Sequence, residues 1–241
     1  MKKLILFVLL GLPCFGAITI SDTYSATGNG TTASITLPFT PSTNDLMILS
    51  FVADSTSGGT PSGWSLAVSQ NQTLYSYVYL YYKIAGASES KTITVSVPSG
   101  GPWSLGYAEF KGIATSPLDR TASATNQGGS GSIASGTTST TSQTSEVWVC
   151  VAGVVQAYYY DVPVYVSSWS GGFTTITGDI FYEYGNPGDT GQNMAYKIVS
   201  STGAASSTAT LDYTATHSTG VIATFKGLTS STRKRVTVER N

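Results

Sequence analysis

The stretch that decides the fold is Leu74-Tyr75-Ser76-Tyr77-Val78-Tyr79-Leu80-Tyr81-Tyr82-Lys83-Ile84. It alternates with a period of two and is rich in aromatic and β-branched residues, which together predict a β-strand. Its two faces are Val78, Leu80, Tyr82 and Ile84 on one side and Tyr77, Tyr79, Tyr81 and Lys83 on the other. Both faces are largely apolar, whereas a strand with one side in water has one polar face. We therefore expect this strand at the centre of the fold.

The composition of the 241 residues favours an all-β extracellular or assembly protein. Charged residues make up 10% of the chain, where about 25% is usual. The hydrophobic fraction of 41% argues against disorder, and Ser, Thr and Gly take the place of the missing charges. The net charge of −1 gives no reason to expect nucleic-acid binding, which normally needs a basic patch.

The N-terminus predicts a secretory signal peptide over residues 1–16. Two lysines precede the apolar run Leu4–Leu10, and small residues follow before Ala17. The alternative is a hydrophobic N-terminal strand that is never removed. After cleavage Cys150 would be the only cysteine, and its apolar neighbours predict an inert core residue.

Two motifs recur along the chain at nearly the same distance. Tyr82-Lys83-Ile84 returns as Tyr196-Lys197-Ile198, 114 positions later, and Phe110-Lys111-Gly112 returns as Phe225-Lys226-Gly227, 115 positions later. A nearly constant offset across two motifs predicts an internal duplication. In this alignment Trp169-Ser170-Gly171-Gly172 is expected roughly where Trp64 stands in the first half.

Short strands with turn signals about every 8–12 residues predict an all-β fold of two homologous antiparallel β-sandwich halves, of jelly-roll or Ig-like type. The crossover between the halves is rich in Ser, Thr and Gly, and is either a linker or an edge strand. The halves are either tandem sandwiches or one intertwined sandwich. The expected segments are a signal peptide (1–16), a first half (17–114), a crossover (115–143), a second half (144–228) and a basic tail (229–241).

Three segments of the first half carry a family resemblance: Asp45-Leu46-Met47-Ile48 leading to Pro61-Ser62-Gly63-Trp64, Tyr81-Tyr82-Lys83-Ile84-Ala85-Gly86, and Ala108-Glu109-Phe110-Lys111-Gly112. The chain resembles a duplicated β-sandwich family found in phage virion or tail-associated proteins and in bacterial secreted surface proteins. The resemblance implies a structural or adhesive role, in a secreted or alternatively a virion location. No functional residues come with its motifs.

The sequence offers little material for catalysis. His217, the only histidine, lies in a predicted turn, and no Gly-x-Ser-x-Gly elbow precedes a helix. A glycosidase would need two facing carboxylates, for which Glu109 and Glu183 are candidates, but both are interpreted as surface residues. We therefore expect a protein that is not an enzyme, with a glycan hydrolase as the weakest alternative.

Tyrosines are the more specific binding candidates. Tyr77, Tyr79 and Tyr81 would form a ladder on one strand face, and Tyr158, Tyr159 and Tyr160 a cluster in a predicted loop. Aromatic rings stack on sugars and anchor protein interfaces. The ladder is either such a surface or is buried against the other half or a neighbouring subunit.

No cofactor is expected except calcium, for which the oxygen ligand candidates are Asp179, Glu183, Asn186 and Asp189. The function that the sequence favours is a non-enzymatic structural or adhesive module of an extracellular surface or virion, binding glycans or another protein through tyrosines. The alternative is a self-assembling subunit of a capsid, tail or extracellular filament. Expected partners are copies of itself, other surface or virion proteins, and glycans, with no nucleic acid and no membrane span once the signal is removed.

Overall fold

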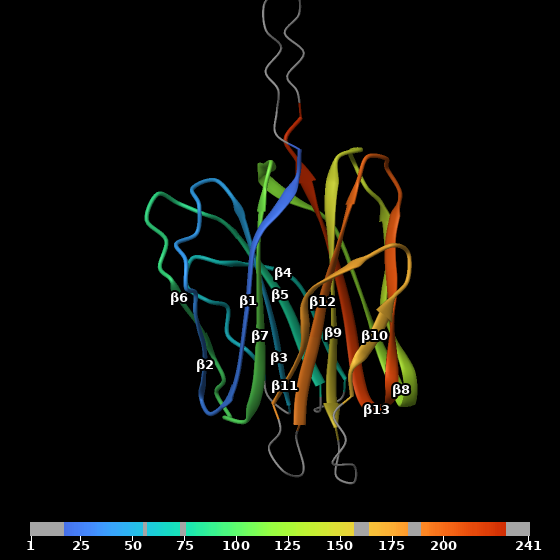
Figure 1. The fold of residues 1–241 in the computed structure, drawn as a ribbon. Coiled ribbons are helices and arrows are strands. Elements are labelled where there is room, and N and C mark those ends of the chain that lie inside the picture. Colours follow the sequence, from blue (N-terminus) through green and yellow to red (C-terminus); the bar gives the residue numbers. More distant parts are fainter. Residues whose placement is uncertain (1–16, 55–56, 73–75, 157–163, 183–188, 230–241) are drawn as a thin grey trace, which may run out of the picture.

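The structure is a computed structural model that describes residues 17–54, 57–72, 76–156, 164–182 and 189–229. In these ranges the chain forms thirteen strands, every strand pair is antiparallel, and no residue is helical (Figure 1). A helix that is long and apolar enough to cross a membrane is accordingly not found there. The prediction of an all-β fold is confirmed. The expected signal peptide and most of the basic tail lie outside the described residues.

The first half contains a five-stranded sheet and a two-stranded sheet. The strand order of the large sheet is β1-β7-β3-β5-β4, and β2 pairs with β6 alone. The decisive stretch supplies β5, which lies between β3 and β4. The bounds of these strands are β1 (Thr19–Asn29), β2 (Thr32–Thr36), β3 (Leu46–Asp54), β4 (Ser65–Gln72), β5 (Ser76–Ile84), β6 (Thr92–Ser96) and β7 (Pro102–Lys111).

The second half forms one six-stranded sheet. Its strand order is β10-β13-β9-β12-β11, and β8 also pairs with β13. The expected crossover, 115–143, is mostly strand β8, so of its two interpretations the edge strand applies. The strands are β8 (Ile113–Thr140), β9 (Glu146–Gln156), β10 (Val166–Trp169), β11 (Thr174–Tyr182), β12 (Asp189–Val199) and β13 (Ala204–Gly227).

The two halves share one topology. The order β8-β13-β9-β12-β11 in the second half matches β1-β7-β3-β5-β4 in the first. The register matches too, since the corresponding pairs are Leu46 with Ile84 and Phe110, and Val147 with Ile198 and Phe225. Even a register shift recurs, between Leu66 and Val68 in β4 and between Thr175 and Thr177 in β11. This repetition is what a duplication would produce; a common origin of the halves stays a prediction.

The register corrects one expected correspondence. Ser65 pairs with Tyr82 and Thr174 pairs with Tyr196, so the residue that corresponds to Trp64 is Phe173. Trp169 instead ends β10, a strand without a counterpart in the first half. The sequence alignment was thus wrong by four residues, because the glycines after Trp169 resemble the turn before Trp64.

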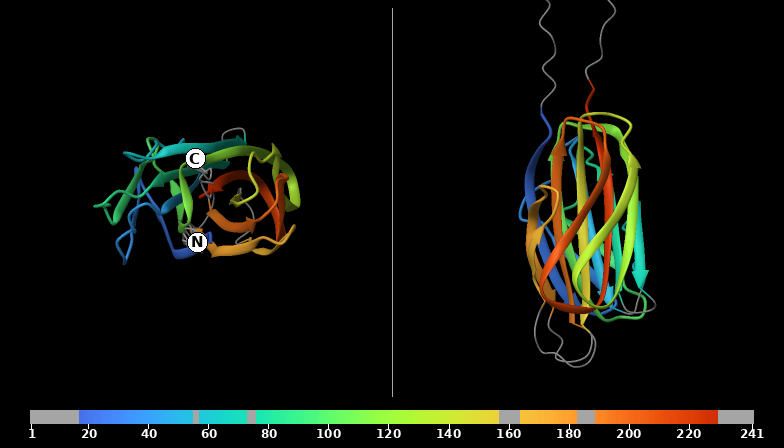
Figure 2. Two further views of the ribbon diagram at one scale, coloured as in Figure 1. Left: turned by 90° about the horizontal axis from the view of Figure 1, so that it is seen from above. Right: turned by 90° about the vertical axis from the view of Figure 1, so that its right-hand side faces the viewer.

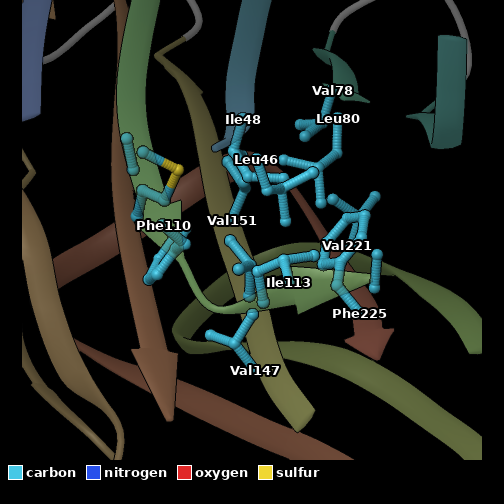
Figure 3. Packing of buried hydrophobic residues seen from close by; sticks show 14 of the residues in the cluster. Leu46, Ile48, Val78, Leu80, Phe110, Ile113, Val147, Val151, Val221 and Phe225 are labelled. Carbon is cyan, nitrogen blue, oxygen red and sulfur yellow. The ribbon is translucent and has the colours of Figure 1, made fainter. Parts of the chain in front are cut away.

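A single hydrophobic core joins the halves. Residues of β3 and β5 pack on residues of β9 and β13, as Figure 3 shows for Leu46, Ile48, Val78 and Leu80 beside Val147, Val151, Val221 and Phe225. Phe110 of β7 packs on Tyr196 of β12, with ring centroids 5.6 Å apart. The approach is so close that a Cβ on Gly153 would overlap the side chains of Val52 and Val78. The halves therefore form one sandwich with a shared core, not two tandem domains.

Both ends of the described chain lie at the same end of the sandwich (Figure 2). A Cβ on Gly227 would meet Ile18, and the Leu228 amide donates to the carbonyl of Gly112, where the first half passes into the second. The strands run along the long axis from this end. We refer to it below as the chain-end side.

Candidate binding surface

The predicted tyrosine ladder is largely internal. Tyr81 is fully buried, its hydroxyl donates to the carbonyl of Gly59 over 3.2 Å, and burial raises its pKa. It belongs to a core cluster between β3, β5 and β7 and the outer pair β2–β6. An exposed binding role for Tyr81 is therefore wrong, and the buried alternative applies. Its cover is the small sheet of its own half, and not the other half or a neighbouring subunit.

The rest of the ladder is partly exposed. Tyr79 stacks on Tyr81 with ring centroids 5.8 Å apart and planes 2° from parallel, and it also contacts Phe51 at 5.9 Å. Burial raises the pKa of Tyr79. Tyr77 lies further along β5 and is also partly buried. A role in binding for Tyr77 and Tyr79 stays a prediction.

Several predicted site residues cannot be placed. The cluster Tyr158, Tyr159 and Tyr160 lies outside the described residues. Of the calcium candidates, Glu183 and Asn186 lie outside them as well, and only the backbone is described for Asp179 and Asp189. Within the described part of the chain, no three His, Cys, Asp or Glu side chains come together as a metal site.

Three other residues singled out from the sequence are described. Cys150 is fully buried in β9, and burial raises the pKa of its thiol, as expected of a core residue. His217 lies inside β13 and not in a turn, since it pairs with both β8 and β9. Glu109 is fully buried, where a surface carboxylate was expected, and it accepts hydrogen bonds from the Ser42 amide and the Tyr107 hydroxyl. A glycosidase carboxylate has to face a substrate cleft, whereas Glu109 is buried and accepts two hydrogen bonds from the protein.

Two hollows of the described surface meet at one tight turn. The turn ends at Gly63, whose φ of +76° favours glycine, and the Trp64 amide donates back to the carbonyl of Pro61 over 3.1 Å. Because Trp64 directly precedes β4, the turn holds its indole at the edge of the sheet.

The first hollow has a volume of about 270 Å³ and lies between this turn and β6. Its apolar lining residues are Met47, Pro61, Trp64 and Ile93. Hydroxyl groups and one carboxylate supply its polar surface. Its lining residues are Met47, Pro61, Ser62, Trp64, Glu89, Ser90, Thr92, Ile93 and Thr94.

The second hollow is an open groove of about 480 Å³ on the other side of the turn. The ends of β4 and β5 form one wall and the start of β8 forms the other, so the groove lies where the two halves meet. Its lining contains two lysines and no acidic residue. The lining residues are Gly63, Ser65, Tyr82, Lys83, Ile84, Thr115, Ser116, Pro117, Leu118 and Lys226.

An ion pair connects the hollows. Lys83 Nζ, in the groove, lies 2.7 Å from Glu89 Oε2, in the first hollow. The other oxygen of Glu89 accepts from the Gly86 amide at 2.7 Å. Burial alone would raise the pKa of Glu89, but these bonds from Lys83 and Gly86 lower it below its ordinary value. The carboxylate therefore stays ionised at neutral pH and holds Lys83 over the turn.

The corresponding lysine of the second half is used differently. Lys197 Nζ donates to the carbonyl of Gly171 over 2.7 Å and lies 5.8 Å from the centre of the Trp148 ring. Its side chain is thus tied to the protein itself. The ion pair that Lys83 makes with Glu89 is thus replaced at Lys197 by a bond to a backbone carbonyl.

The sequence motifs contain several residues of this surface, but they did not reveal the surface itself. Lys83 and Lys226 were both found as parts of repeated motifs, which favoured a structural reading. Their meeting depends on the packing of the halves, because β5 of the first half lies beside β13 of the second. No sequence signal available from one chain shows that contact.

A comparison of the chain with family models, curated proteins and solved structures finds no significant match.

Proposed function

We propose that the protein is a non-enzymatic adhesive module of an extracellular or virion surface, and that it binds glycans through the two hollows around Gly63. The observation that carries the proposal is that each hollow has an aromatic lining residue, Trp64 in the first and Tyr82 in the groove. The Tyr82 ring packs on Phe225 with centroids 5.6 Å apart, which supports it from the core side. Aromatic faces stack on the apolar faces of sugar rings, and a few fixed polar groups supply orientation.

The polar groups of the surface match this role. Hydroxyls of Ser62, Ser90 and Thr92 line the first hollow, and hydroxyls of Ser65 and Thr115 line the groove. Hydroxyl groups both donate and accept hydrogen bonds, as sugar hydroxyls require.

The charge of the groove favours an acidic glycan. Lys83 and Lys226 supply two positive charges to a lining without acids, although Glu89 already neutralises much of Lys83. Lys226 is therefore the better partner for a carboxylate or sulfate group on a sugar.

The test is binding of the folded chain to an array of neutral and acidic glycans, followed by titration calorimetry with the best ligand. Trp64→Ala and Lys226→Ala should each weaken binding about tenfold or more, as central contacts do. The matched controls are Tyr24→Ala, which removes an exposed tyrosine of β1, and Lys111→Ala, which removes the counterpart of Lys226. Both should bind within about twofold of the wild type.

Binding that is weakened as much by the control variants, or no binding to any glycan, would contradict the proposal. Hydrolysis of a bound glycan by the wild-type chain would contradict its non-enzymatic part.

A second candidate function is that of an assembly subunit, favoured by a different surface. Tyr165 and Tyr213 are 41% and 43% exposed and lie on neighbouring backbone segments, since the Asp212 amide donates to the Tyr165 carbonyl over 3.0 Å. Exposed tyrosines are enriched in protein interfaces. Native mass measurement tests it: an assembly that dissociates in Tyr213→Ala but persists in Tyr24→Ala supports it, and a monomer at all concentrations refutes it.

A further inference from the structure

Each half has a buried acidic residue at the same place, directly before the residue that pairs with both neighbouring strands (Leu46 in the first half and Val147 in the second). Asp45 directly precedes Leu46 at the start of β3, and Glu146 directly precedes Val147 at the start of β9. Asp45 is 8% exposed and Glu146 is fully buried. Acidic side chains are seldom buried to this degree without a cationic partner. Both lie at the chain-end side of the sandwich.

In the first half the partner of Asp45 is another acid. Its carboxyl group hydrogen-bonds to Glu109, and its second oxygen, Oδ2, is buried without a partner. The Glu109 carboxylate also accepts from the Ser42 amide at 2.8 Å and from the Tyr107 hydroxyl at 3.0 Å. Glu109 thus fastens the turn before β3 to strand β7.

In the second half Glu146 faces Asp119. The Asp119 carboxylate accepts from the Ser142 amide at 2.6 Å and from the Ser142 hydroxyl at 2.7 Å. Glu146 interacts with Asp119 and Thr224, but neither of its oxygens makes a well-aligned hydrogen bond. Asp119 thus fastens the turn before β9 to strand β8, in the same way with different residues.

Two carboxylates in contact in a buried site cannot both be ionised without repulsion, so such a pair retains one proton. Burial first, and then Glu109, raises the pKa of Asp45 to about 6. Burial first, and then Asp119, raises the pKa of Glu146 to about 7. Hydrogen bonds from Ser142 hold the pKa of Asp119 below its ordinary value against the opposing effect of burial.

The other charged groups around each pair are few. Lys111 of β7 lowers the pKa of Asp45 and Asp22 of β1 raises it. In the second half Arg120 lies next to Asp119 in β8, at 3.9 Å, and Lys226 of β13 is the cross-strand neighbour of Glu146. These cations only partly offset the burial of the acids.

We propose that the two carboxyl pairs make the chain-end side of the sandwich pH-sensitive. At weakly acidic pH each pair shares one proton and fastens its turn to the sheet. Loss of that proton as the pH rises through neutrality places two negative charges together and loosens both turns.

The direction of the effect follows from proton linkage. The folded state binds these protons more tightly than the unfolded chain, so folding takes up protons and is favoured at lower pH. The stabilisation is complete below the carboxyl pKa values of the unfolded chain, near 4, and is lost as the pH rises through 6 and 7. Between pH 5 and pH 8 the unfolding equilibrium should shift about tenfold or more toward the unfolded state.

The test is thermal unfolding from pH 5 to pH 8 of the wild type, Asp45→Asn, Glu146→Gln and the double variant. The melting temperature of the wild type should fall as the pH rises. Each amide, which mimics a neutral acid, should remove part of that slope, and the double variant should show no fall of melting temperature with rising pH. Burial lowers the pKa of His217, so the remaining dependence should run the other way. Asp212→Asn, an exposed acid far from both pairs, should keep the wild-type slope.

Hydrogen exchange of the wild type provides a readout that does not depend on any variant. After correction for intrinsic exchange, the protection of the backbone amides in 42–46 and 142–147 should fall about tenfold between pH 5 and pH 8. A wild-type melting temperature that does not change over this range, a double variant that keeps the slope, or unchanged protection in both turns would overturn the proposal.

Discussion

The two halves use the same strand order but fill the outer face of the sandwich in different ways. In the first half, β5 presents Tyr77, Tyr79 and Tyr81 to that face. In the second half β12 has Gly191, Asn193 and Ala195 at the matching register positions. Corresponding positions of the two halves thus have large side chains in β5 and small ones in β12. The difference lies in what covers them.

In the first half the cover is a separate layer. Strands β2 and β6 pair only with each other, and the breaks before and after them contain Gly30, Gly100 and Gly101, all with positive φ. Because this small sheet stands apart from the large one, large rings are needed to fill the space between them. Tyr81, Tyr107 and Phe51 are the largest fully buried side chains in this space.

In the second half the cover is continuous with the sheet. β8 and β13 remain paired through the corresponding region, and β8 folds back so that Asn126 bonds both the amide and the carbonyl of Ala134. The strands approach closely around small residues and Trp169, whose indole donates to Asn193 over 2.8 Å. The same strand order therefore encloses large rings where the outer strands form a separate sheet, and mostly small residues where they continue the main sheet.

The largest expected effect is at Tyr81. Tyr81→Ala should lower the free energy of unfolding by about 3–5 kcal/mol, because the separate β2–β6 layer cannot follow the lost ring inward. Denaturant unfolding measures the change. Tyr77→Ala, on a partly exposed position of the same face, should cost clearly less. Equal losses of unfolding free energy in the two variants would contradict the distinction between a buried Tyr81 and a partly exposed Tyr77.

A smaller effect is expected where the second half packs tightly. A Cβ on Gly220 would overlap the backbone of Ala134 and Ser135, so Gly220→Ala should cost about 1–3 kcal/mol by the same measurement. Gly131→Ala is the matched control, because a Cβ there meets nothing within 4 Å. If the two variants are equally stable, the close approach of β8 and β13 is refuted.

The smallest effects should come from the two corresponding lysines. Lys83→Met and Lys197→Met should each lower the free energy of unfolding by under about 1 kcal/mol. Lys83→Met loses a partly exposed ion pair, and Lys197→Met loses a hydrogen bond to a carbonyl together with a cation–π contact. High salt should remove more of the Lys83 effect. The Lys83 contribution is present above the ordinary pKa of Glu89 and should fade as the pH falls below it, because that pKa is lowered in the fold. Melting temperatures across salt and pH check both points.

Much of the framework could be predicted from local patterns. The two apolar faces of β5 were visible because a strand buried on both sides lacks polar alternation, and in the structure Leu80 faces the shared core while Tyr81 faces the outer layer. The repeated motifs also correctly marked equivalent register positions, since they lie where the central strands pair.

What could not be predicted depends on tertiary contacts. The polar run around His217 looks like a turn, yet it stays extended because β8 and β9 pair with it on both sides. The surface around Gly63 combines Trp64 with Lys226, which come from different halves. Glu109 gave no sign of burial, because its partners Ser42 and Tyr107 are recognisable only once β3 and β7 are paired.

The meeting of Ile18 with Gly227 has a topological consequence. The first half passes into the second at Phe110-Lys111-Gly112, and the second half ends in the equivalent Phe225-Lys226-Gly227, close to the point where the first begins. A circularly permuted chain that starts at Ile113, with Leu228 joined to Ile18 by a short linker, would retain every strand pair. The order of the two halves along the chain is therefore not a requirement of this fold. The chain termini lie at a position equivalent to the connection between the halves, so either position could hold the termini.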